Sequence, residues 1–218
     1  MGYNVAIDGP AGAGKSTIAK LVAKEKGYIY VDTGAMYRGM AIHFLDKGIR
    51  AEETDKIVNA LKDAEVTIRY EEGLQQVYLN GRNITDRLRE EEVGKMASLT
   101  SAIPQVRQKL LELQKGLART QDVIMDGRDI GTCVLPDADV KIYLTASVET
   151  RAKRRYDELT EKGIACDLDE IERDIKERDE RDSTREIAPL KQAEDAVLVD
   201  SSHMTIDEVV AAIVKLCR

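Results

Sequence analysis

The chain has 218 residues, of which 43% are hydrophobic and 33% are charged, and its formal net charge is −7. These values are typical of a globular protein with one core and room for a small insert. The bulk acidity argues against nucleic acid as the main partner, and no apolar run is long enough to span a membrane, so we expect no membrane partner.

The first predicted elements are a buried strand at residues 3–7 and a helix whose apolar residues recur at helical spacing from residue 18 to residue 22. A glycine-rich loop joins them and fits the pattern of glycine, four free positions, then glycine, lysine and serine. This pattern predicts a loop that binds the phosphates of a nucleotide. The residues expected to contact the nucleotide are Gly9, Pro10, Ala11, Gly12, Ala13, Gly14, Lys15, Ser16 and Thr17.

The chemistry of this loop follows from its residue types. Glycines let several backbone N–H groups face one anion, and the helix N-terminus adds unpaired donors and the positive end of a dipole. Lys15 can reach the β- and γ-phosphates, and the Ser16 hydroxyl can ligate Mg²⁺. A glycine-rich turn that merely starts a helix is the alternative, which the flanking strand and helix disfavour.

The next residues predict a strand at 28–31, a helix from about 33 to 47 and an amphipathic helix at 52–63. The period then changes to alternation, with strands at 66–70, 75–79 and 83–85. Glu-Glu-Gly joins the first two, and Asn80-Gly81 is a strong hairpin signal before the third. This predicts an antiparallel insert over roughly residues 64–85, followed by helices around 93–99 and 104–117.

The C-terminal half returns to buried strands, at 123–125, 140–144 and 197–199. A charged helical region lies between the last two, over residues 149–185, and Gly163 could divide it into a hinged flap. The closing helix, about 205–215, should turn Ile206, Val209, Val210 and Ile213 inward. The fold class is therefore α/β, a parallel sheet flanked by helices with a small antiparallel insert and a helical lid.

Polar clusters follow the predicted strands directly, at residues 8–16, 32–38, 126–129 and 200–202. Ligands of parallel sheets bind beyond the carboxyl ends of the strands, so we expect these clusters at one edge of the sheet. The three cysteines, by contrast, lie far apart with no metal-ligand spacing, and the N-terminus has no secretion signal, which is typical of a cytoplasmic protein.

Two of these clusters offer groups that grip phosphate. Thr33, Tyr37 and Arg38 stand at a helix start, where a hydroxyl and a guanidinium can hold an anion, although a capped helix with a surface arginine is also possible. Arg128-Asp129 lies in a glycine-flanked loop, where an exposed turn with a local ion pair is the alternative.

The charged region carries many arginines, and a solvated helix laced with ion pairs explains most of them. A phosphoryl-transfer site nevertheless needs cations over the migrating group, and a mobile arginine-rich segment can supply them. The two histidines, His43 and His203, show no catalytic pattern. A phosphate oxygen is already anionic at neutral pH, so such a reaction needs positioning and charge neutralisation rather than a general base.

With these motifs in view, the sequence resembles the bacterial cytidylate kinases nearly end to end. The motifs that carry the resemblance lie at 7–10, 12–17, 32–38, 103–107, 126–132 and 176–182. The resemblance implies one domain over residues 1–218, with a core, a monophosphate-binding insert at about 33–103 and a lid at about 155–170. It also implies transfer of the γ-phosphate of ATP to CMP or dCMP with Mg²⁺, by a monomer of pyrimidine nucleotide metabolism.

The resemblance assigns roles by motif position. It places Lys15, Arg128 and Arg185 in catalysis. It places the acceptor phosphate against Thr33, Arg38, Arg128 and Arg185, the sugar against Tyr37, Arg178 and Asp182, and the cytosine against Ser98, Arg107 and Asp129. Thr33 stands where some members have serine, and both residues offer a hydroxyl.

Two other classes of protein remain open from the sequence alone. A nucleotide-binding switch protein would carry an Asn-Lys-x-Asp guanine motif, which this chain lacks. A kinase of a small alcohol would need a base near the acceptor hydroxyl, and Asp32 or Asp126 could serve.

Overall fold

The computed structural model describes residues 2–218, and clustering of its contacts divides the chain into two compact units. We call Tyr3–Tyr30 with Asp122–Arg218 the core unit, and Gly2 with Val31–Gln121 the second unit. Within residues 2–218, a five-stranded sheet has the order β2-β6-β1-β7-β8. Its strands are β1 (Asn4–Asp8), β2 (Ile29–Asp32), β6 (Val123–Gly127), β7 (Val140–Thr145) and β8 (Val197–Asp200).

The β1 strand lies in the middle of this sheet and pairs in parallel with β6 and β7, while β7 pairs in parallel with β8. Val5, Ile7, Ile124 and Leu144 are almost fully buried, as expected for strands covered by helices. The sequence prediction of a parallel sheet flanked by helices is therefore confirmed.

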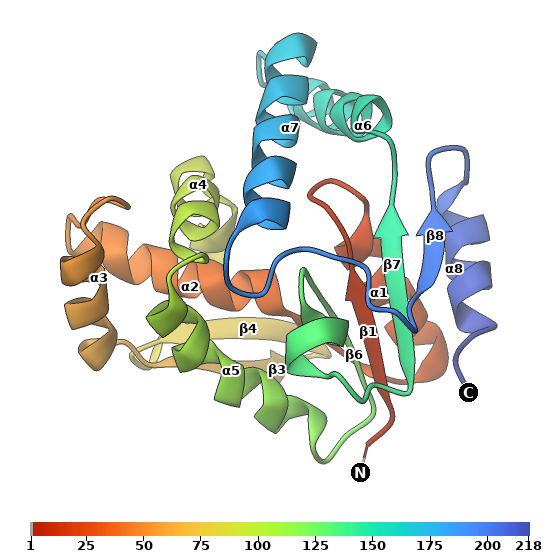
Figure 1. The fold of residues 1–218 in the computed structure, drawn as a ribbon, viewed down its shortest axis with the longest axis horizontal. Coiled ribbons are helices and arrows are strands. Elements are labelled where there is room, and N and C mark those ends of the chain that lie inside the picture. The colour runs from red at the N-terminus through yellow and green to blue at the C-terminus, as the bar shows by residue number, and fades with distance from the viewer. Residues whose placement is uncertain (1) are drawn as a thin grey trace. The chain divides into compact units, whose positions relative to one another are not determined.

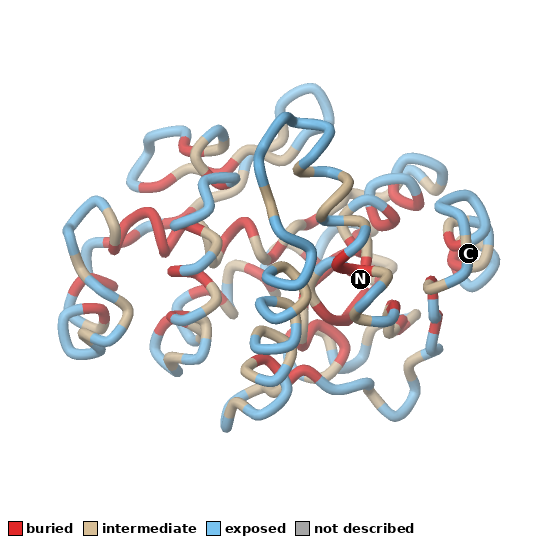
Figure 2. Tube along the Cα trace, turned by 90° about the horizontal axis from the view of Figure 1, so that it is seen from above, coloured by how far each residue is buried: buried red, intermediate tan, exposed pale blue. Residues whose placement is uncertain are grey.

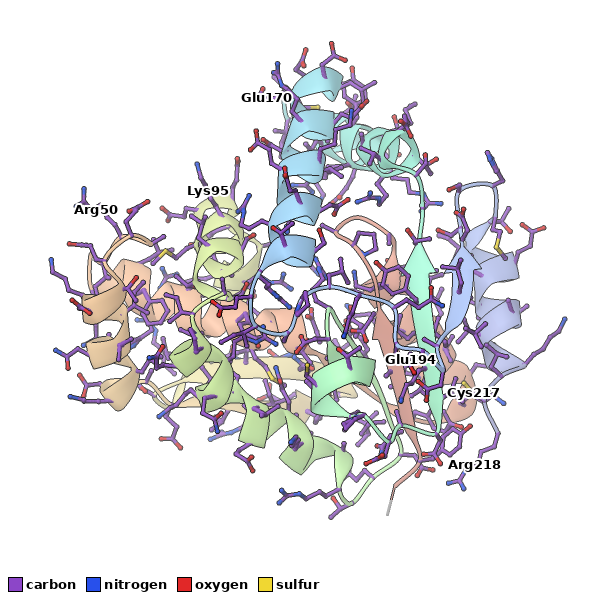
Figure 3. The ribbon with its side chains drawn as sticks, viewed as in Figure 1. Arg50, Lys95, Glu170, Glu194, Cys217 and Arg218 are labelled. Carbon is purple, nitrogen blue, oxygen red and sulfur yellow. The ribbon has the colours of Figure 1, made fainter. Side chains whose placement is uncertain are left out.

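Helices α1 (Lys15–Lys26) and α8 (Ile206–Val214) pack on the sheet of the core unit. Ile18 and Val22 of α1 meet Val209 and Ile213 of α8 in one apolar cluster, which Cys217 extends (labelled in Figure 3). The expectation that Ile206 and Val210 also face inward is wrong in part. Ile206 is 54% exposed because it begins the helix directly after the Thr205 cap, whereas Val210 packs at the margin of the cluster.

The second unit contains helices α2 (Thr33–Asp46), α3 (Thr54–Ala60), α4 (Glu91–Thr100) and α5 (Pro104–Ala118). It also holds 3₁₀ turns at Leu61–Asp63 and Thr85–Arg89. Its antiparallel sheet consists, in the described chain, of β3 (Val66–Glu71), β4 (Leu74–Leu79) and β5 (Arg82–Asn83). Buried positions alternate with exposed ones along α4 and α5, as expected for helices with one apolar face, whereas α2 is buried or half-buried along almost its whole length (Figure 2).

Two tight turns set the register of this small sheet. Glu72-Gly73 and Asn80-Gly81 both adopt positive φ values, 51° and 77° in the first turn and 50° and 79° in the second, which is typical of two-residue hairpin turns. The predicted return strand at 83–85 is misplaced. The Thr85 hydroxyl accepts the Val77 N–H at 2.9 Å, and the chain turns into a 3₁₀ helix instead of continuing the strand.

The charged region of the core unit forms α6 (Val148–Glu161) and α7 (Leu168–Thr184), and Figure 1 shows α6 continuing from the carboxyl end of β7. The break falls at Gly163, which has a φ of 70°. Asp167 caps α7 by accepting the Glu170 N–H at 2.8 Å, and Figure 3 shows Glu170 near the end of α7 farthest from its link to β8. Within residues 2–218, no helix combines the length and the apolar character needed to cross a bilayer.

Candidate active site

The glycine-rich loop occupies residues 9–14, between the end of β1 and the start of α1. Gly9 has a φ of 151°, and a Cβ there would lie 1.9 Å from the Leu144 carbonyl oxygen, so no other residue fits. Gly14 caps α1 with a φ of 86° in the left-handed region. The backbone therefore curls around the N-terminus of α1 in the way that phosphate binding requires.

Lys15 is the first residue of α1, and its side chain is buried against the same loop. Its Nζ donates a hydrogen bond to the Pro10 carbonyl oxygen at 2.7 Å. Burial lowers the pKa of Lys15 well below its usual value, the charge of Arg128 lowers it further, and the carboxylate of Asp126 opposes both. A bound anion would stabilise the charged form, which makes this lysine a natural phosphate contact.

Ser16 and Asp126 come together at the start of α1, although the sequence separates them widely. The Ser16 hydroxyl donates to one carboxylate oxygen of Asp126 at 2.9 Å, and the Tyr30 hydroxyl donates to the other at 3.0 Å. These are hard oxygen groups of the kind that Mg²⁺ prefers. Within residues 2–218, no group of three or more histidine, cysteine, aspartate or glutamate side chains is placed to hold a metal ion.

A second group of charges joins the turn after β6 to the C-terminal end of α7. Arg128 Nε donates to Asp182 Oδ2 at 2.9 Å, and Arg185 approaches Asp129 and Asp182 at 3.7 and 3.9 Å. The side chains of Asp129, Asp182 and Arg185 are at most 7% exposed. Burial raises the pKa of Asp182, but the guanidinium groups of Arg128, Arg178 and Arg185 together outweigh it, so the pKa lies below its usual value.

The cations of the core unit gather near the phosphate loop. Arg178 lies one helical turn before Asp182 on α7, and its charge, like that of Arg128, lowers the pKa of Lys15. The structure therefore brings Lys15, Arg128 and Arg178 within electrostatic reach of one another. Several cations beside one phosphate loop raise the local positive potential, so this cluster is suited to a polyanionic ligand.

Other cations of α6 and α7 behave as the solvated-helix alternative predicts. Lys153 pairs with Asp157, Lys162 with Glu158 at 2.5 Å, and Lys176 with Glu172 at 2.6 Å, all on the outer surface. Such exposed pairs contribute little stability.

Residues predicted to bind substrate in the second unit lie at the start of α2 and on α4 and α5. Asp32 caps α2 through the Ala35 N–H at 2.8 Å and also pairs with Arg38 at 3.1 Å. The Arg38 Nε is buried and has no hydrogen-bond partner within residues 2–218, which leaves one donor for an anion. Thr33, the first residue of α2, is buried.

The structure brings Tyr37, Arg107 and Ser98 into one neighbourhood of this unit. The Arg107 guanidinium lies 5.6 Å from the centre of the Tyr37 ring and donates to the Ser101 carbonyl at 3.3 Å. The Ser101 hydroxyl in turn donates to the Ser98 carbonyl at 3.0 Å. An arginine near an aromatic ring can bind a planar polar ligand.

Three residues have roles in the structure that the sequence analysis did not assign to them. Asp126 partners Ser16, Asp8 binds the turn after β6, and Arg151 donates to the Ala11 carbonyl of the phosphate loop at 2.9 Å. Arg151 also pairs with Asp179 of α7 at 2.6 Å. The only available signal was position, since Asp8 and Asp126 are the polar residues closest to the carboxyl ends of buried strands.

A phosphate loop at the carboxyl end of a parallel strand, with a buried lysine and a cluster of arginines, defines the class of P-loop kinases. The family model for cytidylate kinases matches residues 5–218. The cytidylate kinase of Caldicellulosiruptor saccharolyticus is 51% identical over 213 residues, covering 98% of this chain and 94% of the relative. That of Lactobacillus johnsonii is 50% identical over 214 residues, covering 98% of this chain and 93% of the relative. This chain belongs to the cytidylate kinase family.

The similarity to solved structures is more distant. A crystal structure of an uncharacterized protein from Eubacterium ventriosum has a TM-score of 0.52 at 12% identity, covering 98% of this chain and 96% of that one. At that identity the similarity concerns the fold alone.

Proposed function

We propose that this chain is an ATP-dependent kinase that transfers the γ-phosphate of ATP to CMP or dCMP, giving ADP and CDP or dCDP. The observation that carries the proposal is the identity of about half of all residues with cytidylate kinases over nearly the whole length of both chains. The cluster of Lys15, Arg128 and Arg178 beside the phosphate loop supports it, because phosphoryl transfer requires cations around the migrating group.

The mechanism follows from the chemistry of these groups. The backbone of residues 9–14 holds the phosphates of ATP, and Lys15 neutralises charge on the β- and γ-phosphates. Ser16 and Asp126 would hold Mg²⁺, which would supply positive charge to neutralise the phosphates of ATP. No base is needed, because the attacking phosphate oxygen of CMP is already an anion.

The acceptor contacts are proposed residue by residue. Thr33, Arg38, Arg128 and Arg185 hold the phosphate of CMP, Tyr37, Arg178 and Asp182 hold its sugar, and Ser98, Arg107 and Asp129 hold its base. Arg128 is engaged with Asp182 in the structure, so an incoming phosphate competes with that carboxylate for the guanidinium. We further propose that residues 33–103 bind the monophosphate and that the enzyme acts as a cytoplasmic monomer.

A coupled assay of ADP release tests the proposed activity. With ATP and Mg²⁺, CMP and dCMP should support rapid turnover, UMP and AMP should be poor acceptors, and shikimate should give none. A shikimate rate equal to the CMP rate would instead favour a kinase of small alcohols.

The segment between the two charged helices provides a further prediction, that residues 155–170 form a lid which closes on ATP. Gly163 breaks the chain between α6 and α7, and the residues around it are exposed. Closure should protect their amides, so hydrogen exchange in 155–170 should slow when a bisubstrate analogue binds. Unchanged exchange there, with protection of residues 9–17, would mean that ligand binds without a lid.

A further inference from the structure

Asp8 is the last residue of β1, directly before the first glycine of the phosphate loop. Its side chain does not point into that loop. One carboxylate oxygen accepts the Ile130 N–H at 2.7 Å, and the other accepts the Gly131 N–H at 2.7 Å. Asp8 is 5% exposed, so both bonds are shielded from water.

These two amides directly follow Arg128 and Asp129, the residues proposed to hold the acceptor phosphate and base. The backbone on their N-terminal side is fixed by the sheet, where Gly127 stands opposite Asp8 in the register of β1 and β6. On the C-terminal side the Asp8 carboxylate fixes Ile130 and Gly131. The chain segment that carries Arg128 and Asp129 is thus anchored at both ends to one residue of β1.

A carboxylate at this buried position lowers the stability of the fold. Burial raises the pKa of Asp8 to about 6, against the two amide bonds that lower it, and the neighbouring Asp129 raises it further while Lys15 opposes this. The stem of Lys141 also packs against Gly131 beside Asp8. A buried charge lowers stability compared with a neutral acceptor, so fold stability alone does not explain a carboxylate here.

We propose that Asp8 is a positioning residue for the acceptor nucleotide, one that sets the place of Arg128 and Asp129 through the backbone of Ile130 and Gly131. The inference rests on the proposed function and deepens it. Asp8 touches no substrate in this account. A carboxylate is suited to the task because each of its two oxygens accepts one amide, which fixes the turn in translation and rotation.

The Asp8→Asn variant tests the proposal with minimal change of shape. A carboxamide has one acceptor oxygen, and its NH₂ group would face the second amide donor to donor. The turn should loosen, so the KM for CMP should rise about tenfold and the preference for CMP over UMP should narrow. The Kd for ATP, measured by calorimetry, should change less than about twofold, because the bonds of the Asp8 carboxylate lie outside the phosphate loop.

Two further variants separate positioning from stability. Ile213→Val removes one buried methylene from the core between the sheet and α8 and should lower the Tm, with no change in the KM for CMP or in the CMP preference. Gly131→Ala keeps the carboxylate, but its Cβ would lie 3.2 Å from Lys141 Cδ and 3.4 Å from Asp8 Oδ2. Gly131→Ala should displace the turn and raise the KM for CMP, as Asp8→Asn does. If Asp8→Asn fails to fold, this variant tests whether the position of the turn controls CMP binding.

Hydrogen exchange gives a readout that does not depend on turnover. Exchange of residues 128–135 should be faster in Asp8→Asn than in the wild type, while exchange of α8 stays unchanged. The proposal is overturned if the folded variant keeps the wild-type KM for CMP and CMP preference, or if ATP and CMP binding weaken equally. A wild-type protein that fails to phosphorylate CMP would instead refute the proposed function, and the exchange comparison would still report whether Asp8 holds the turn.

Discussion

Replacing Lys15 with alanine should lower kcat by roughly 10²–10³-fold, the usual effect of removing one preorganised electrostatic contact from a transition state. Lys15 is buried at the start of α1, and its Nζ lies 2.7 Å from the Pro10 carbonyl oxygen, inside the curl of the phosphate loop. No other lysine of the phosphate loop can replace it, because Lys15 is the only one in residues 9–17. The substitution therefore removes the cation that faces the β- and γ-phosphates.

The fold should tolerate this change. Burial lowers the pKa of Lys15, which means that its charged form is destabilised in the folded protein, so its removal relieves an unfavourable interaction. Steady-state kinetics and a thermal melt of Lys15→Ala measure both effects. Lys24→Ala, an exposed lysine on the same helix, is the matched control and should keep wild-type kcat and Tm. Near-normal turnover in a folded Lys15→Ala variant would show that Lys15 has no catalytic role.

Replacing Asp129 with alanine should reduce turnover of CMP and narrow the preference for CMP over UMP. Cytosine presents an N4 amino donor beside the N3 acceptor, whereas uracil presents an O4 acceptor beside an N3–H donor. An ionised carboxylate only accepts, so Asp129 can bind the amino group of cytosine but would face O4 of uracil lone pair to lone pair. Arg107, which only donates, can bind N3 or O2 of cytosine.

The size of the preference for CMP over UMP follows from the free-energy cost of leaving buried polar groups unpaired. The Asp129 side chain is 6% exposed, with Arg185 NH2 at 3.7 Å, so a mismatched base would meet a desolvated charge. We expect the wild type to favour CMP over UMP by about 10²-fold in kcat/KM, the lower end of such discrimination, because a water molecule can bridge a mismatch. Asp129→Ala removes both the attraction and the repulsion, and it also loosens Arg185.

Arg128→Ala is the comparison that separates base reading from phosphate binding. Arg128 is adjacent in sequence but is proposed to bind the acceptor phosphate, so its loss should weaken CMP and UMP alike. Steady-state kinetics with CMP and with UMP give the ratio of the two kcat/KM values for the wild type and for each variant. If Asp129→Ala kept the full wild-type ratio of CMP to UMP, the base-reading role of Asp129 would be wrong.

The features that the sequence predicted well are those with local causes. Gly9 and Gly14 need backbone conformations that only glycine adopts freely, and Asn80-Gly81 favours its turn wherever it occurs. Short buried strands that alternate with helices predict a parallel sheet, because each strand and each helix is recognised from its own run of residues. These patterns depend on residues within a few positions of one another, so they are readable without the fold.

The features that it missed depend on distant partners. Asp8 bonds to amides 122 and 123 positions away, and Arg151 donates to a carbonyl 140 positions away, so neither role leaves a local pattern. Ile206 was misassigned because helical spacing alone does not show that this residue, the first of α8 after the Thr205 cap, is exposed. The return strand was misplaced because the Thr85 hydroxyl replaces a backbone group in bonding Val77, which periodicity does not reveal.

The fate of the γ-phosphate is the measurement that tests the proposed activity most directly. ATP labelled at the γ-phosphate should be incubated with Mg²⁺, CMP and the purified protein, and the products should be separated and identified. We predict that the label appears in the β-phosphate of CDP, in amounts equal to the ADP formed, and that Lys15→Ala slows its appearance. Label released as inorganic phosphate, with no labelled CDP, would contradict the assignment of this chain as a CMP kinase.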